Sequence, residues 1–130
     1  ADDVVIASSC SGALDLAITA LLDEGDNLLV PKPGFSLYET LAVAKGIEPR
    51  KYNLIPEKQW EADIAHLESL IDGKTRGVVV TNPSNPCGSN YSAQHIEEIV
   101  KVCARHKLPI IADEIYAEMV FAPGKFHALA

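Results

Sequence analysis

The feature that most constrains how this chain can fold is its alternation between short apolar runs and longer segments with helical periodicity. Apolar runs with the length of buried strands occur at residues 28–30, 77–81 and 109–112. Segments whose apolar residues recur three or four positions apart occur at residues 8–22, 36–45 and 92–105. This alternation predicts an α/β fold, with helices flanking a mostly parallel sheet and right-handed crossovers between its strands.

Weaker patterns complete the expected order of elements. Residues 4–6 indicate a brief first strand, and residues 47–54 indicate another extended segment. A polar connection over residues 53–63 follows, and Trp60 is expected to anchor it. Asp63 has the position of an N-cap for a short helix.

The composition limits the classes of function. With 130 residues, the chain has room for one domain with one modest core. Eighteen acidic against eleven basic residues give a formal net charge of -7, and no cluster of Lys or Arg occurs, which argues against a nucleic-acid partner. The apolar runs are too short to span a bilayer, and the start of the sequence has no signal or transit pattern, so no membrane partner is expected.

The cysteines and the two ends of the sequence give expectations about the compartment of the protein and about its full length. The three cysteines, Cys10, Cys87 and Cys103, lack CxxC spacing, which favours a reduced compartment over secretion. We expect a cytoplasmic location, with the mitochondrion as the alternative. The sequence opens at Ala1 inside an apparent structural element and stops without an evident terminal one, so we expect a piece of a longer protein.

Two carboxylates, Asp113 and Glu114, follow directly after the apolar run at 109–112. In an open α/β sheet, ligands bind at the carboxyl ends of the strands, so a carboxylate at this position can meet a cation from outside the chain. Burying it without a partner costs several kcal/mol, roughly as for any ion taken out of water. The alternative is that Asp113 caps the following turn beside a surface loop. This stretch alone leaves both hypotheses open.

Small residues begin the helical segment at 8–22. Ser9, Cys10 and Ser11 would allow a phosphate to approach the exposed amides of a helix N-terminus, and the two hydroxyls add donors. The alternative is that Ser9 or Ser11 is only an N-cap, which is the commoner use of serine at such a place.

Two further signals also come after expected strands. Phe35 could lie flat against a planar ligand, although a Phe beside an apolar strand is usually a core residue. The segment NPSNPCGS at 82–89 contains two Asn-Pro pairs, which make a rigid loop that could present the amide of Asn82 or Asn85. The alternative is a plain turn. Because all these signals fall at the carboxyl ends of expected strands, each strengthens the others.

Several common catalytic motifs do not occur in the sequence, namely GxGxxG, GxSxG and HExxH. The four histidines lack the spacing of metal ligands, so no metal site is expected and each is assigned a surface or helix-face role: His66, His95, His106 and His127. Cys87 has no identifiable base near it, which argues against a nucleophilic cysteine.

Four motifs taken together carry a resemblance to a known family. They are SSCSGAL at 8–14, PGFSLYE at 33–39, NPSNPCGS at 82–89 and ADEIY at 112–116. In this order they resemble the pyridoxal-phosphate-dependent class I/II aminotransferases of fold type I, and most closely their tyrosine aminotransferase branch. The connection YNLIPEKQWEAD at 52–63 resembles the same branch. The resemblance runs through essentially the whole chain and implies that residues 1–130 are part of the large, cofactor-binding domain.

The resemblance implies roles for the residues around a bound pyridoxal 5'-phosphate. Ser9, Cys10 and Ser11 stand where the family holds the cofactor phosphate. Phe35 stands where an aromatic ring stacks on the face of the pyridine ring.

Three further residues stand at positions that contact the polar atoms of the cofactor ring. Asn85 and Tyr116 correspond to side chains that hydrogen-bond its phenolic oxygen. Asp113 corresponds to the carboxylate that pairs with the pyridinium nitrogen and keeps it protonated. The resemblance therefore implies that Asp113 and Tyr116 are the catalytic residues within this chain.

The implied activity is transamination of an aromatic amino acid such as tyrosine with a 2-oxo acid such as 2-oxoglutarate, in a homodimer. The family's Schiff-base lysine lies in a Ser/Thr-x-x-Lys setting that does not occur here, and Lys125, the only lysine after Asp113, has different neighbours. The arginine that binds the substrate carboxylate is also expected beyond Ala130. We therefore expect the 130-residue chain alone to be inactive.

Two alternatives to an aminotransferase remain. One is a related fold type I lyase, either a carbon-sulfur lyase or an enzyme like aminocyclopropane carboxylate synthase, which would use the same cofactor contacts. The other is a non-catalytic module with the same fold that never acquires a lysine.

Overall fold

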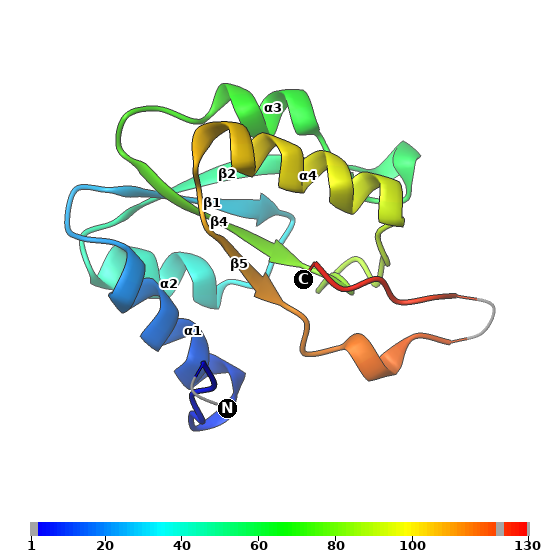
Figure 1. Cartoon of the computed structure of the whole chain (residues 1–130), viewed down its shortest axis with the longest axis horizontal. Coiled ribbons are helices and arrows are strands. Elements are labelled where there is room, and N and C mark those ends of the chain that lie inside the picture. The colour runs from blue at the N-terminus through cyan, green and yellow to red at the C-terminus, as the bar shows by residue number, and fades with distance from the viewer. Residues whose placement is uncertain (1–2, 122–123, 130) are drawn as a thin grey trace.

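The computed structural model describes residues 3–121 and 124–129, which form one five-stranded sheet with helices on both faces (Figure 1). The helices are α1 (Ser9–Leu21), α2 (Leu37–Ala44), α3 (Ile64–Ser69) and α4 (Ala93–His106). The strands are β1 (Asn27–Lys32), β2 (Glu48–Ile55), β3 (Glu61–Ala62), β4 (Thr75–Thr81) and β5 (Ile110–Asp113). The predicted α/β class and the predicted order of helices and main strands are confirmed.

The order of the strands, which the sequence alone did not predict, creates a crevice. The order is β3-β2-β1-β4-β5, and every pair is parallel except β2 with β3. From β1 the chain moves outward to β2, and it then returns to the other side of β1 to add β4 and β5 (Figure 1). The connections that leave β1 and β4 therefore diverge at the carboxyl ends of these strands. In open α/β sheets this is the place where ligands bind.

Alternating side chains of the strands fill two apolar layers. Leu28 and Val30 of β1 pack with α1 and α2, whereas Leu29 points to the opposite face, where α3 and α4 lie. Val79 of β4 belongs to the first layer, and its neighbours in the strand belong to the second. Because successive side chains of a strand alternate between faces, apolar runs without polar interruptions are what a sheet covered on both sides requires.

Two parts of the expected chain path differ from the structure. Residues 4–6 do not form a strand, and their side chains are 72%, 80% and 94% exposed. A strand needs a neighbour for its backbone hydrogen bonds, and none of the five strands in the described part of the chain pairs with them. The connection at 53–63 also holds a short helical turn and β3, while Trp60 packs partly buried against the core as expected.

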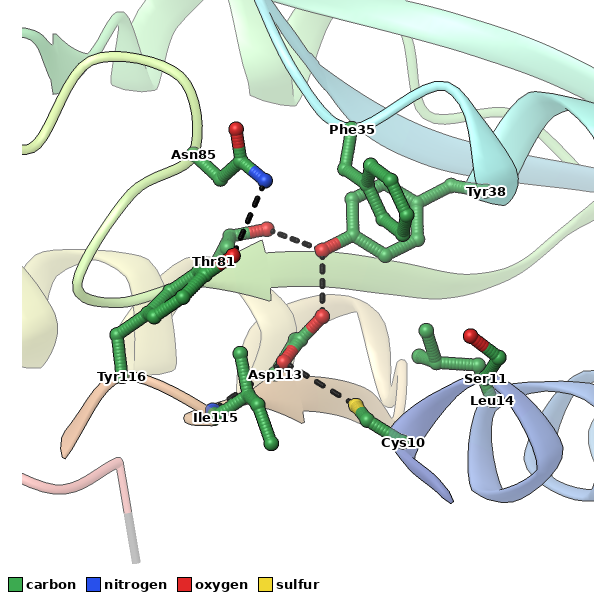
Figure 2. A pocket seen from close by; sticks show the side chains of 10 residues that line it. All are labelled: Cys10, Ser11, Leu14, Phe35, Tyr38, Thr81, Asn85, Asp113, Ile115 and Tyr116. Carbon is green, nitrogen blue, oxygen red and sulfur yellow. Dashed lines mark hydrogen bonds between the residues drawn. The ribbon is translucent and has the colours of Figure 1, made fainter. Parts of the chain in front are cut away.

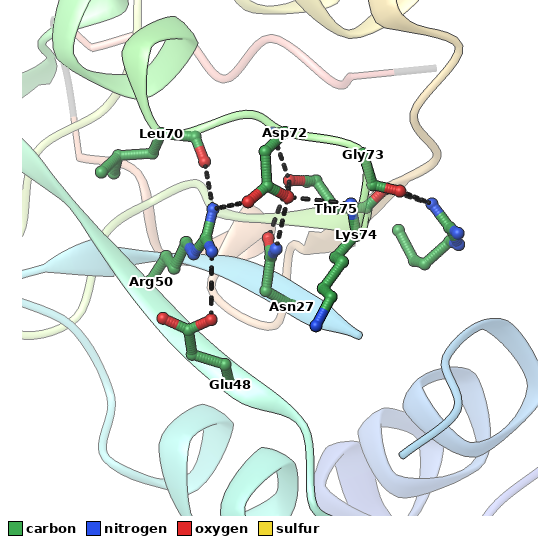
Figure 3. A network of polar contacts seen from close by, with 9 residues as sticks. Asn27, Glu48, Arg50, Leu70, Asp72, Gly73, Lys74 and Thr75 are labelled. Atoms are coloured by element: carbon green, nitrogen blue, oxygen red, sulfur yellow. Dashed lines mark hydrogen bonds and ion pairs between the residues drawn. The ribbon is translucent and has the colours of Figure 1, made fainter. Parts of the chain in front are cut away.

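A polar network joins the amino ends of the strands, opposite the crevice (Figure 3). Asp72 accepts hydrogen bonds from the Asn27 side chain and the Lys74 amide, and Arg50 lies 2.7 Å from its other oxygen. The Lys74 amide, Arg50 and Asn27 hold the pKa of the Asp72 carboxyl well below its usual range. These contacts tie the loop before β4 to β1 and β2, so they fix the edge of the sheet that carries no candidate site.

Candidate active site

A cavity of about 140 Å³ lies at the carboxyl ends of β1, β4 and β5, where the strand order places the crevice (Figure 2). It is lined by Cys10, Ser11, Leu14, Phe35, Tyr38, Thr81, Asn85, Asp113, Ile115 and Tyr116. Six of the seven residues singled out from the sequence are in this set, although they come from four separate segments of the chain. The exception is Ser9, which begins α1, is exposed and does not line the cavity.

Asp113 is the charged group of the cavity. It ends β5 and is only 6% exposed, so it does not point into bulk solvent. Its Oδ2 accepts a 2.7 Å hydrogen bond from the Tyr38 hydroxyl, and its Oδ1 is 3.3 Å from the amide nitrogen of Ile115. The bond to the Ile115 amide shows that Asp113 caps the following turn, as one hypothesis held. It does so as a buried group on the cavity wall rather than beside a surface loop.

The Cys10 thiol is the third donor to this carboxylate. Its Sγ lies 3.5 Å from Asp113 Oδ1, at the start of α1. Partial burial and the adjacent negative charge of Asp113 both raise the pKa of the Cys10 thiol. Cys10 therefore stays protonated at neutral pH and can keep donating to Asp113.

Sequence reasoning missed Tyr38 and Thr81, which also line the cavity. The Tyr38 hydroxyl lies 2.8 Å from Thr81 Oγ1 and belongs to α2, whereas Thr81 ends β4. A signal was present, because Tyr38 and Ala42 share the buried face of α2 and a buried tyrosine hydroxyl needs a partner. The identity of that partner depended on the strand order.

The loop after β4 gives different roles to Asn82 and Asn85, between which the sequence alone did not decide. Asn82 is fully buried and holds backbone: its Oδ1 accepts from the Tyr91 amide, and its Nδ2 donates to the carbonyl of His127. Asn85 instead faces the cavity, where its Nδ2 lies 3.3 Å from the Tyr116 hydroxyl. The Asn82 side chain therefore holds the loop in place, and the loop presents the Asn85 side chain to the cavity.

Phe35 is not a core residue, so that alternative is wrong. Its side chain is 38% exposed at the mouth of the cavity, and its ring meets Tyr38 edge to face, with 5.8 Å between centroids and an interplanar angle of 89°. This arrangement leaves a face of the Phe35 ring available to a flat ligand.

The N-terminus of α1 opens toward the same cavity. The N-cap position is Ser8, whose side chain makes no capping hydrogen bond, so neither Ser9 nor Ser11 serves as the N-cap. Ser9 has a φ of 63°, which is uncommon for a residue other than glycine. Ser11 and Cys10 line the cavity at this helix end, where backbone amides and the helix dipole favour an anion.

The other candidates lie away from the cavity. Cys87 packs against the core on the side of α3 and α4. His95 is buried on α4, where its Nε2 accepts from the Ala62 amide, so the expected helix-face role holds for it without surface exposure. Within residues 3–121 and 124–129, no group of three or more His, Cys, Asp or Glu side chains could hold a metal ion. None of the described helices is long and apolar enough to cross a membrane.

Comparison with known proteins places the chain in a family. The family described as aminotransferase class I and II matches residues 1–130. The chain belongs to this aminotransferase family. It is 55% identical to the tyrosine aminotransferase of Bos taurus over 130 residues, which are 100% of this chain and 29% of that protein. The crystal structure of tyrosine aminotransferase from Leishmania infantum matches with a TM-score of 0.94 and 46% identity, over 96% of this chain and 34% of that one.

A relative named for a different activity also matches the chain. The S-alkyl-thiohydroximate lyase of Arabidopsis thaliana is 34% identical over 125 residues, which are 96% of this chain and 27% of that protein. The chain therefore spans about 30% of the length of the curated relatives it matches. Because relatives named for different activities match it, membership of the family does not by itself fix the reaction.

The family is dependent on pyridoxal phosphate, and the donor set of the cavity fits that group. A carboxylate has about four acceptor positions, and the three donors to Asp113 leave one for a protonated ring nitrogen. Asn85 and Tyr116 together offer N–H and O–H donors to a phenolic oxygen. The exposed face of Phe35 and the open N-terminus of α1 suit a flat ring and a phosphate.

Proposed function

We propose that, in the full-length protein, this chain is part of the cofactor-binding domain of a pyridoxal-phosphate-dependent aminotransferase. The enzyme moves the amino group of an aromatic amino acid such as tyrosine to a 2-oxo acid such as 2-oxoglutarate. The substrate assignment is supported by the identity to tyrosine aminotransferases, which reaches 55% across the whole chain.

The observation that carries the proposal is the buried Asp113 carboxylate on the wall of the cavity, with an acceptor position to spare. The bound cofactor supplies a ring that accepts electrons released at the α-carbon of the substrate. Asp113 holds a proton on the ring nitrogen, because a negative charge beside a base raises the pKa of that base. The effect of losing the Asp113 charge would therefore fall mainly on the chemical step, because the interaction would be strongest in the transition state.

The remaining cavity residues bind and orient. Asn85 and Tyr116 hydrogen-bond the phenolic oxygen, Phe35 covers one face of the ring and excludes water, and the start of α1 holds the phosphate through Cys10 and Ser11. None of the ten residues that line the cavity is a lysine. We assign the proton shuttle to a lysine elsewhere in the full-length protein, as the resemblance to the family implies.

A steady-state assay of the full-length protein with tyrosine and 2-oxoglutarate tests the proposal. We expect glutamate and the 2-oxo acid of tyrosine as products. The substitution Asp113→Asn, which keeps the shape but not the charge, should lower kcat by at least about 100-fold, as for loss of other preorganised electrostatic groups. Glu114→Gln is the matched control, because the Glu114 side chain accepts from the Leu129 amide and is not among the residues that line the cavity. This variant should keep kcat within about twofold.

A carbon-sulfur lyase is the second candidate, because the Arabidopsis lyase shares 34% identity over nearly the whole chain. Release of ammonia and thiol from a cysteine conjugate, with no amino transfer from tyrosine, would establish it instead. Absence of both reactions in a full-length protein without a Ser/Thr-x-x-Lys segment would point to the non-catalytic module.

A further inference from the structure

Tyr38 places a hydroxyl against Asp113 although none of the proposed cofactor contacts requires it. The residue is 1% exposed, and its oxygen lies 2.7 Å from Asp113 Oδ2 and 2.8 Å from Thr81 Oγ1. The other two donors to Asp113 are longer, at 3.5 Å from Cys10 and 3.3 Å from the Ile115 amide, and both reach Oδ1. Within the described residues, Tyr38 is the only hydrogen-bond partner of Oδ2.

Proton counting fixes the direction of both hydrogen bonds. An ionised carboxylate can only accept, so the single proton of the Tyr38 hydroxyl is donated to Asp113. The Thr81 hydroxyl must then donate its own proton to the Tyr38 oxygen. The result is a chain of two donors that runs from Thr81 through Tyr38 to Asp113, as the dashed lines in Figure 2 show.

The frame around this chain is rigid. Tyr38 belongs to the apolar layer formed by α1, α2 and the sheet, and the Phe35 ring packs at right angles to its ring. Thr81 and Asp113 face each other in the register between β4 and β5. Burial, together with the charge of Asp113, raises the pKa of the Tyr38 hydroxyl far above its ordinary value, so it does not lose its proton at any physiological pH.

We propose that Thr81 and Tyr38 form a donor relay that fixes the orientation of the Asp113 carboxylate, with Tyr38 as the positioning residue. Tyr38 donates to Oδ2 from the apolar layer beneath the cavity. The remaining acceptor position of Asp113 is thereby directed toward the cofactor. A charge-assisted hydrogen bond of this kind is about twice as strong as a neutral one. The inference rests on the proposed cofactor site.

The affinity of the cofactor-free, full-length protein for pyridoxal 5'-phosphate, measured by equilibrium dialysis, tests the relay without any turnover. Tyr38→Phe removes only the hydroxyl and should raise Kd by about tenfold, the factor expected when a hydrogen bond to a charged group is lost. In an Asp113→Asn background the same substitution should change Kd by less than about twofold. Coupling of this size between two residues is the signature of an interaction that runs through the carboxylate.

Two further variants separate the relay from general loss of packing. Tyr52→Phe is the matched control, because Tyr52 is also buried and donates to the Val79 carbonyl but lies in the other apolar layer. It should leave Kd unchanged within about twofold. Thr81→Val should raise Kd by a smaller factor than Tyr38→Phe and have no further effect when combined with it, whereas Thr81→Ser, which keeps the hydroxyl, should restore binding.

The outcomes are distinct. Equal effects of Tyr38→Phe with and without the Asp113 charge would overturn the relay and leave the proposed function in place. If Tyr38→Phe does not fold, Thr81→Val tests the relay alone. A Kd that Thr81→Val leaves unchanged, or raises equally with and without the Asp113 charge, would overturn the relay in the same way. Wild-type protein that does not bind the cofactor at all would overturn both the proposed function and the relay.

Discussion

At the scale of single residues, the cavity concentrates its chemistry on one carboxylate with three donors. A buried carboxylate is stable only when its lone pairs are occupied, and Asp113 receives a tyrosine hydroxyl, a thiol and a backbone amide. Burial on the wall of a cavity distinguishes Asp113 from Asp72, which also receives three donors but whose side chain is 44% exposed.

The reactivity of Cys10 reports the charge of Asp113. Burial and the Asp113 carboxylate raise the pKa of the thiol, and only the thiolate is alkylated. In cofactor-free, full-length protein, the pH midpoint for alkylation of Cys10 by iodoacetamide should therefore lie above that of an ordinary cysteine. The substitution Asp113→Asn removes both the charge and the acceptor of the thiol hydrogen bond, so it should lower the midpoint.

Mass spectrometry of the Cys10 peptide across a pH series measures this midpoint. The plateau rate at high pH separates changes of accessibility from changes of ionisation. A midpoint that stays in place or rises in the Asp113→Asn variant would show that the carboxylate does not act on Cys10.

At the scale of elements, most of the helices and strands could be predicted because periodicity and capping are local properties of the sequence. Asp63 was expected as an N-cap, and its side chain accepts from the His66 amide. The pairing of Tyr38 with Asp113 was not predictable, because the two residues are 75 positions apart and meet only through the strand order. The prediction of a strand at residues 4–6 was wrong for the same reason. The apolar pattern is a local property of the sequence, whereas a strand also needs a neighbouring strand that the local sequence does not specify.

The caps of α4 and α2 provide a matched pair for testing the account of the helices. The Ser92 side chain accepts from the His95 amide at the start of α4, whereas Ser36 makes no side-chain capping bond at the start of α2. Ser92→Ala should lower the free energy of unfolding by about 1 kcal/mol. Ser36→Ala should change it by less than about 0.5 kcal/mol. Equal shifts of the urea midpoint in the two full-length variants would contradict this explanation of the capping.

At the scale of the whole molecule, the site exists because a doubly wound sheet brings residues from the two ends of the chain together. Cys10 and Asp113 are 103 positions apart, yet they meet where the start of α1 lies beside the end of β5. The seven residues singled out from sequence came from motifs that were expected to follow strands, and six of them line the cavity, although no strand precedes Cys10 and Ser11 in the described residues. The hydrogen bonds that join Thr81, Tyr38 and Asp113 were not predictable in this way, because they depend on the strand order.

The central claim is that Asp113 keeps a bound pyridine ring protonated. Nuclear magnetic resonance of the full-length protein, loaded with pyridoxal 5'-phosphate carrying ¹⁵N in its ring, reports that protonation directly. At pH 8 the account predicts a pyridinium chemical shift for the wild-type protein and for Glu114→Gln, and a neutral pyridine shift for Asp113→Asn. A neutral shift in the wild type, or a pyridinium shift that survives in Asp113→Asn, would contradict it.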